Sequence, residues 1–318
     1  QEPILLVDQI LSDNTPQSDS SIDFSKTSEE DGTKGLYYTN QNTEDNKITY
    51  YFRGAVENNY VKFAGFYWKI IRINEDESIR LIYQGTDYSD PSSAIIGGGF
   101  NESCEDNAYV GYMYGTAGSN TYLETHKNIN DSYIKNQIDT WYEENLLNYS
   151  AYLADSGFCG DRSIANIAGL WDPMDTALGY GTNYTIYGAF NRLVTNKTPQ
   201  FTCPQENDLY TTSTSNKGNK ALDYPIGLLT ADEVAYAGGA HWKENNSYYL
   251  NIGLQYWTIS PATGPATGCT IEDNGMLSCG TGVCGGTSTI PVINLNSSVE
   301  IIEGGNGTSS NPYVVKTN

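Results

Sequence analysis

The pattern of hydrophobic and polar positions is most regular between residues 63 and 85, which read FAGFYWKIIRINEDESIRLIYQG. Two apolar runs flank the acidic turn NEDE, and this arrangement predicts a β-hairpin. Because alternate residues of a strand point to opposite faces, the first run has two apolar faces and the second run has one. The residues concerned are Phe66, Trp68 and Ile70 opposite Tyr67, Ile71 and Ile73, followed by Ile79, Leu81 and Tyr83. We therefore expect the first run to be a central strand covered on both sides.

Two stretches have helical spacing. Residues 131–155 place five apolar side chains on one helix face, with Asp131 or Ser132 as the N-cap; these five are Ile134, Ile138, Trp141, Leu146 and Tyr149. In residues 228–239, Thr230 and Glu233 form a capping box, and Gly238 or Gly239 ends the helix. Residues 155–225 are rich in Gly, Asn and Tyr without a clear period, which predicts long loops.

Strand-like runs return in the C-terminal part of the chain, for example YYLNIGLQYWTISPA and STIPVINLNSSVEII. The order of strands, helix, long loops, helix and strands predicts an α+β fold. We expect mainly antiparallel β-sheet with two principal helices, and the two ends of the chain meeting in one sheet. Residues 33–318 are predicted to form a single domain.

Residues 1–32 are predicted to be an extended arm in front of this domain. Residues 12–32 are polar and acidic, a composition typical of a linker. The segment before it carries apolar side chains that suit a short helix or an added strand, namely Ile4, Leu5, Leu6, Val7, Ile10 and Leu11. We expect the arm to be held in place by contacts with one of two surfaces, that of a neighbouring subunit or that of the chain's own domain.

The charge balance restricts the partners. The chain has 17 basic and 38 acidic residues, a formal net charge of −21. Binding to nucleic acid or to an anionic membrane needs clustered Lys and Arg, so we expect neither partner. No run of 18 apolar residues occurs, so no membrane span is expected in this chain. Since residue 1 is Gln, we expect a mature chain whose leader or anchor has been removed or left out.

The six cysteines predict three disulfides and a protein that works outside the cell. They are Cys104, Cys159, Cys203, Cys269, Cys279 and Cys284, with no CxxC pair and no His at zinc-finger spacing. Fifteen pairings are possible. Short loops favour partners within residues 269–284, and Cys159 with Cys203 is the preferred longer pair.

Several segments together resemble a family of uncharacterised secreted or surface-anchored proteins of Gram-positive gut bacteria, often made behind a pilin-type or secretory leader. The matching segments include YYFRGAVENNYVKFAGFYWKIIRI, SYIKNQIDTWYEENL, YPIGLLTADEVAYAGG, YWTISPA and PVINLNSSVEIIEGGNG. The family has Gly-Val-Arg before its Pro-Val-Ile-Asn-Leu run, whereas this chain has Thr289 and Ile290 there. The resemblance implies a C-type-lectin-like fold, related to the formylglycine-generating-enzyme fold.

The sequence contains no recognisable arrangement of catalytic residues. The only two histidines, His126 and His241, lack a second His at ligand spacing. Cys269, Cys279 and Cys284 could supply a thiol oxidase only as free thiols. The pairs Asp139 with Glu143 and Asp232 with Glu233 are interpreted as solvated or capping residues rather than as glycosidase carboxylates. We therefore expect no catalytic residue.

Two kinds of binding site stay open. Calcium is the cofactor for which the sequence offers oxygen ligands, in NESCEDN, namely Glu102, Glu105 and Asp106, but these do not follow the EF-hand spacing. Sugar rings could stack on exposed aromatic side chains; the candidates are Trp171, Tyr184, Tyr187, Trp242 and Tyr256.

The sequence therefore favours a non-enzymatic extracellular protein of a bacterial cell surface. The first hypothesis is that the protein is a subunit of a pilus-like filament or an adhesin, and that its arm docks onto a neighbouring subunit. The alternative is a monomeric lectin-like module that binds carbohydrate or a host surface from an anchor.

Overall fold

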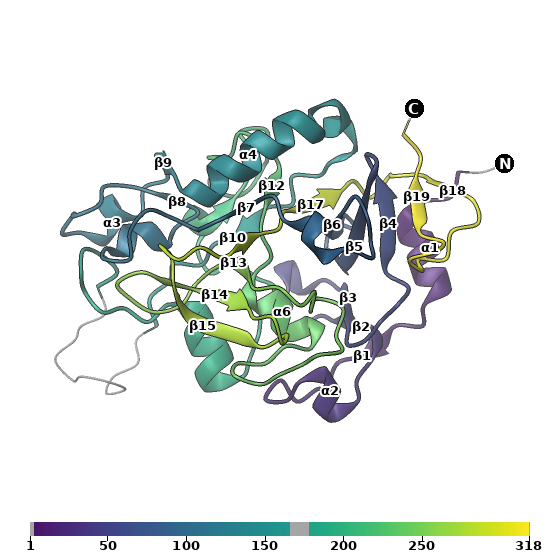
Figure 1. Ribbon diagram of the computed structural model, residues 1–318, viewed down its shortest axis with the longest axis horizontal. Coiled ribbons are helices and arrows are strands. Elements are labelled where there is room, and N and C mark those ends of the chain that lie inside the picture. The colour runs from purple at the N-terminus through teal and green to yellow at the C-terminus, as the bar shows by residue number, and fades with distance from the viewer. Residues whose placement is uncertain (1–2, 166–177, 318) are drawn as a thin grey trace.

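The computed structural model describes residues 3–165 and 178–317. In these ranges the chain forms two main β-sheets, two small two-stranded sheets and several short helices (Figure 1). The predicted α+β class is confirmed.

Ten strands form the largest sheet among the residues described. Its main path runs β1-β2-β3-β5-β4-β19-β18, and β5 also pairs with β6, which continues to β17 and β12. Most pairs are antiparallel, but β1 with β2 and β19 with β4 are parallel. The strands are β1 (Gln17–Ser18), β2 (Gly35–Thr39), β3 (Thr49–Arg53), β4 (Tyr60–Phe63), β5 (Phe66–Ile73), β6 (Ile79–Gly85), β12 (Ile226–Gly227), β17 (Val292–Leu295), β18 (Ile301–Ile302) and β19 (Tyr313–Val315).

The predicted hairpin is β5 and β6, and it lies in the middle of this sheet. β5 pairs with β3, β4 and β6, and every residue of β6 is buried. Trp68, Ile70 and Leu81 are fully buried. The prediction of a central strand with two covered faces is therefore confirmed. Strands β19 and β18 at one edge and β1 at the other also confirm that both ends of the chain join this sheet.

The second sheet has five strands in the order β15-β14-β13-β16-β7. They are β7 (Gly97–Gly98), β13 (Tyr256–Pro261), β14 (Thr267–Ile271), β15 (Leu277–Gly282) and β16 (Ser288–Thr289). The two small sheets pair β8 (Met113–Tyr114) with β9 (Asn130–Asp131), and β10 (Phe158–Cys159) with β11 (Leu209–Tyr210).

Both predicted helices are present. Helix α4 (Tyr133–Asn145) has Ser132 as its N-cap, and α6 (Ala231–Ala237) has the expected capping box and ends at Gly238 with φ 116°. Helix α4 is shorter than predicted: Leu146 leaves helical geometry at φ −120°, and the chain continues as a 3₁₀ helix over Leu147–Tyr152. Two further short helices are α3 (Tyr122–Thr125) and α5 (Gly188–Phe190), the latter followed by a π-helical turn over Asn191–Asn196.

The N-terminal arm packs on its own domain. Helix α1 (Leu6–Asp13) lies beside β18 and β19 (Figure 1), where Leu6 donates its backbone N–H to Val299 at 2.9 Å. Further along, Phe24 and Ile22 pack against a small aromatic cluster of Tyr37, Tyr51, Phe201 and Tyr236. Helix α2 (Ser28–Asp31) has its own capping box at Thr27 and ends at Gly32. The polar segment is therefore held by strand pairing, capping and aromatic contacts.

Three disulfides join the six cysteines, and no cysteine is free. Cys159 pairs with Cys203 as predicted, and Cys269 pairs with Cys279 within the predicted range. The third links Cys104 to Cys284 over 180 residues. The Cys159–Cys203 pair braces the long loops between α4 and β12, as expected.

Candidate functional site

A charged recess lies where the β5–β6 hairpin meets α6 and two long loops. We use this name for a pocket of about 150 Å³. Twelve ionisable side chains line it. Seven of them form its ion pairs: Arg72, Glu75, Arg80, Asp161, Arg192, Asp232 and Glu233. The disulfide Cys159–Cys203 also borders it and joins the segment just before Asp161 to the loop that follows the π-helical turn of Arg192.

These seven groups are paired with one another. Glu233 accepts from Arg72 Nε at 3.1 Å and forms an ion pair with Arg80, whose Nε lies 2.6 Å from Glu233 Oε1, while Glu75 accepts from Arg72 Nη1 at 3.2 Å. Arg192 binds Asp232 through two nitrogens, at 2.9 and 2.8 Å. Burial lowers the pKa of Arg80 to about 10 even beside Glu233. A pocket of this kind suits polar ligands better than apolar ones, because an apolar ligand would displace water from its ionised groups without offering a hydrogen bond in return.

Sequence reasoning missed the charged recess. It treated Asp232 and Glu233 as solvated or capping residues; the capping role of Glu233 is confirmed, but both residues are buried, at 4% and 2% exposed. The available signal was Arg72 and Arg80, two arginines inside apolar strands. Buried charges need partners, so these arginines predict acidic residues from elsewhere in the chain.

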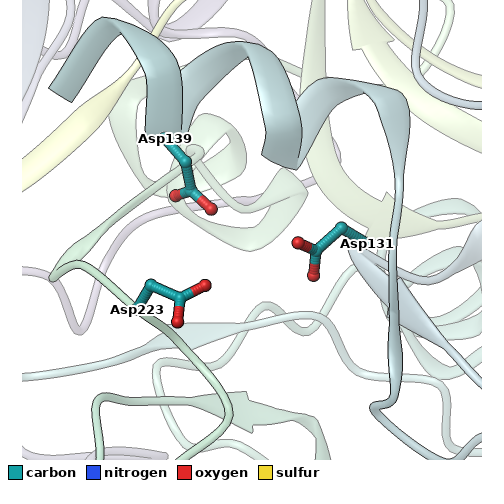
Figure 2. A group of neighbouring side chains, drawn as sticks. All are labelled: Asp131, Asp139 and Asp223. Atoms are coloured by element: carbon teal, nitrogen blue, oxygen red, sulfur yellow. The ribbon is translucent and has the colours of Figure 1, made fainter. Parts of the chain in front are cut away.

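A second cluster consists of three carboxylates that converge near the start of α4. Asp131, Asp139 and Asp223 have oxygens within 4.8 Å of one another and point toward a common space (Figure 2). This spacing resembles that of a metal site, but the ammonium group of Lys135 already forms ion pairs with all three carboxylates. Its Nζ lies 3.2 Å from Asp131, 2.6 Å from Asp139 and 3.3 Å from Asp223, and its side chain is fully buried. We interpret the cluster as a structural ion-pair network.

This network makes a pH-dependent prediction. Burial raises the pKa of Asp139 to about 6, from 3.8. A carboxyl with a raised folded-state pKa stabilises the fold most below about pH 3.8 and loses that contribution as the pH rises through about 6. We expect the Asp139 carboxyl to titrate with a midpoint near pH 6, measured by carbon NMR. A midpoint near 4 for Asp139 would contradict the prediction.

Neither histidine is arranged as a general base. His126 is 2% exposed, its Nε2 lies 2.8 Å from the Gly179 carbonyl, and burial lowers its pKa to about 3. Burial and the nearby Lys197 lower the pKa of His241 to about 4. Both imidazoles are therefore neutral at pH 7. Their low pKa values make them weak bases.

The calcium candidates do not form a ligand set. Asp106 is 8% exposed and uses both carboxylate oxygens to accept backbone N–H groups, those of Ala108 and Gly118, each at 2.8 Å. Glu102 and Glu105 are exposed. In the part of the chain that the structure describes, the only three-carboxylate group with ligand-like spacing is the Asp131 cluster. The interpretation of Glu102, Glu105 and Asp106 as a calcium site is corrected accordingly.

The aromatic candidates differ sharply in accessibility. Tyr256 is 1% exposed and donates its hydroxyl to the Leu250 carbonyl at 2.7 Å, and Tyr187 is fully buried. Their proposed role in sugar stacking is wrong, because no ligand can reach their ring faces. Trp171 lies outside the described residues, and Tyr184 is half-buried. Trp242, in contrast, is 74% exposed, the highest value among the large apolar side chains described.

The Trp242 platform, our name for the rings of His241 and Trp242, has a defined geometry. The two rings stack with centroids 4.7 Å apart and an interplanar angle of 24°. One indole face therefore packs on imidazole and the other faces outward. Trp242 has φ 56°, a conformation that costs a bulky residue about 1 kcal/mol or more. Its backbone N–H donates to Leu277 at 3.0 Å, which helps to hold this conformation.

The arm helps to position the Trp242 platform. Glu30 of α2 accepts from Lys243 Nζ at 3.0 Å, next to Trp242. Asn245 donates to Ser28 Oγ at 3.0 Å, and Glu29 accepts from the Asn246 backbone at 2.9 Å. These contacts and a hydrogen bond from Ser247 Oγ to Glu29 at 3.3 Å tie the loop that follows α6 to the arm.

The apolar residues of the arm are placed against the chain's own domain. Leu6, Val7 and Ile10 are at most 7% exposed and belong to the main core, and Ile4, Leu5 and Leu11 pack against it. Docking of these residues on a neighbouring subunit stays a prediction. It would require the arm to leave the position seen here.

No protein-family model, no curated protein and no solved structure matches this chain. Of the helices in the described ranges, none combines the length and the apolar character that a bilayer span needs.

Proposed function

We propose that this chain is a non-enzymatic extracellular binding module that recognises carbohydrate through the Trp242 platform. One observation carries the proposal: a tryptophan that is 74% exposed is held in a strained backbone conformation with one ring face open. Strain of about 1–3 kcal/mol persists where the surroundings enforce it, and such positions cluster at binding sites. The exposed ring is therefore better explained by a ligand than by packing.

Carbohydrate is the ligand class that fits this surface. The electron-rich face of an indole attracts the C–H groups of a sugar ring. Hydrogen-bonding side chains close to Trp242 in sequence, such as Lys243, Glu244 and Asn246, can serve the hydroxyl groups. Nucleic acid would also stack on an indole, but the net charge of −21 opposes it.

The non-enzymatic part of the proposal rests on the state of the reactive groups. All six cysteines are in disulfides, both histidines have pKa values well below 7, and the buried carboxylates of Asp232 and Glu233 in the charged recess are engaged by arginines. Disulfides are typical of proteins outside the cytoplasm. Display on a bacterial cell surface and a C-type-lectin-like arrangement are part of the proposal, on the strength of the family resemblance.

Replacing Trp242 with alanine is expected to abolish glycan binding without unfolding the chain. The substitution removes the stacking surface, and we expect at least a tenfold loss of affinity, about 1.4 kcal/mol. Stability should change little, because the ring is exposed. The measurement is a glycan array followed by calorimetry with the best ligand.

Leu123→Ala is the matched control for this test, because Leu123 is 72% exposed and lies elsewhere on the surface. It should bind glycans like the unaltered chain. Absence of binding to every glycan, or equal binding by the Trp242→Ala variant, would reject the proposed function.

Self-association through the arm is the second candidate. The buried contacts of Leu6, Val7 and Ile10 form a docking site that the arm of another copy could occupy in the same way. This exchange would also move α2, and with it the contacts that tie the Trp242 loop.

A further inference from the structure

We propose that the charged recess is a second binding site, separate from the Trp242 platform, and that it takes a small zwitterion of the α-amino-acid type. The inference rests on the size of the pocket, on the excess of one charge sign and on hydrogen-bonding capacity that the protein leaves unused.

The size of the charged recess limits its ligand. Its volume is about 150 Å³, which corresponds to about five water molecules, and a cavity of this volume encloses a ligand of roughly six non-hydrogen atoms. Small amino acids such as alanine, serine and threonine have roughly six to eight such atoms. A hexose has about twice the six atoms that fit and would not be enclosed.

The charge of the charged recess disfavours simple anions. Five cationic and seven acidic side chains line it, which leaves two negative charges in excess. A simple anion would add to that excess, whereas an ammonium group would offset it. A lone metal ion is not favoured either, because in the described ranges no three carboxylates of the recess have ligand-like spacing. A ligand with an ammonium and a carboxylate group can pair with the acidic and with the basic side chains of the recess.

Unused donors are available for the ligand's carboxylate. Arg72 Nη2 makes no hydrogen bond with the described residues, although its Nε and Nη1 are bonded to Glu233 and Glu75. Each terminal nitrogen of Arg192 uses one of its two hydrogens, on Asp161 and Asp232. Both side chains are only 12–13% exposed, so their charges are weakly screened. Guanidinium groups in such sites bind carboxylates strongly.

Acceptors remain for the ligand's ammonium group. Each oxygen of Glu75 accepts one hydrogen bond, from Arg72 Nη1 at 3.2 Å and from the Glu44 backbone at 3.3 Å. A carboxylate offers about four acceptor positions. The Glu75 side chain is 9% exposed, which places this acceptor at the inner surface of the pocket.

The test is calorimetric titration of the intact protein with single amino acids, using alanine, serine and threonine as probes. We expect one-to-one binding that is at least tenfold tighter, about 1.4 kcal/mol, than binding of acetate, methylamine or glycerol. Those three probes carry only the negative charge, only the positive charge, or no charge. Equal binding of any of them would overturn the zwitterion assignment, and so would the absence of amino-acid binding at millimolar concentration.

A pair of variants locates the site without touching its ion pairs. Gln200 lines the recess and its side chain donates only to the Thr202 carbonyl, so Gln200→Trp should fill the pocket and remove binding. Asn196 is exposed at the end of the π-helical turn that precedes Gln200 and does not line the recess, so Asn196→Trp should bind normally. Retained binding in Gln200→Trp would place the ligand elsewhere and overturn the proposal. Trp242→Ala should leave amino-acid binding unchanged, which keeps this test independent of the glycan test.

Discussion

Replacing Arg162 with methionine is expected to lower the free energy of unfolding by about 3–5 kcal/mol. Arg162 and Asp208 are 1% and 0% exposed and form an ion pair at 2.7 Å. Arg162 also donates to the Met113 carbonyl at 2.9 Å. The substitution leaves the Asp208 carboxylate buried without its cation. Urea unfolding followed by circular dichroism measures the loss.

Two variants make this prediction specific. Lys127→Met removes a surface pair, in which Lys127 and Glu124 are 45% and 44% exposed, and should cost less than about 1 kcal/mol. Adding Asp208→Leu to Arg162→Met should recover much of the loss, because it removes the unpaired buried charge. A loss below about 1 kcal/mol for Arg162→Met alone would contradict the assigned role.

Removing the disulfides by paired Cys→Ser substitutions is expected to destabilise the chain in the order of the loops they close. Cys104–Cys284, Cys159–Cys203 and Cys269–Cys279 span 180, 44 and 10 residues. The loss of chain entropy in the unfolded state gives about 5, 4 and 3 kcal/mol respectively. Thermal unfolding of the three double variants checks the order.

The Cys269–Cys279 variant is the internal control, because its sulfurs lie between directly paired residues of β14 and β15, and the sheet keeps these strands together. A larger loss for this pair than for Cys104–Cys284 would contradict the proposed bracing of the fold by the long-range disulfide.

Local signals in the sequence were sufficient for the central hairpin and for the helix caps. The alternation of apolar residues in β5 follows directly from strand geometry, and the Thr230–Glu233 capping box needs only residues that are near one another in the chain. The end of α4 was predicted less well, since Leu146 leaves the helix through a backbone change that no Gly or Pro announces.

The charged recess could not be predicted, because it depends on contacts between distant segments. Arg192 meets Asp161 and Asp232, which are 31 and 40 residues away in sequence, and Arg72 meets Glu233 over 161 residues. Nothing in the local pattern around Asp161 or Arg192 distinguishes them from surface charges.

Exposure was the other property that the sequence left open. Trp242 and Tyr256 were equal candidates for stacking, yet one is 74% exposed and the other 1%. Tyr256 lies in β13, which the second sheet buries, whereas Trp242 follows α6 in a loop. The difference is decided by tertiary packing, and residue type alone does not reveal it.

The arm links the structural and functional parts of this account. Its apolar end completes the core beside β18 and β19, and its second helix fixes the loop that carries Trp242 through the Lys243–Glu30 pair. A ligand on the Trp242 platform would therefore bind a surface whose position depends on contacts between the arm and the domain.

The most direct test of glycan recognition is to follow the indole N–H signals of the tryptophans by NMR while the best-binding glycan is added. Our account predicts that the Trp242 signal shifts progressively and saturates, while the signals of the buried Trp68 and Trp257 stay in place. A Trp242 signal that does not move when the protein is saturated with glycan would contradict it.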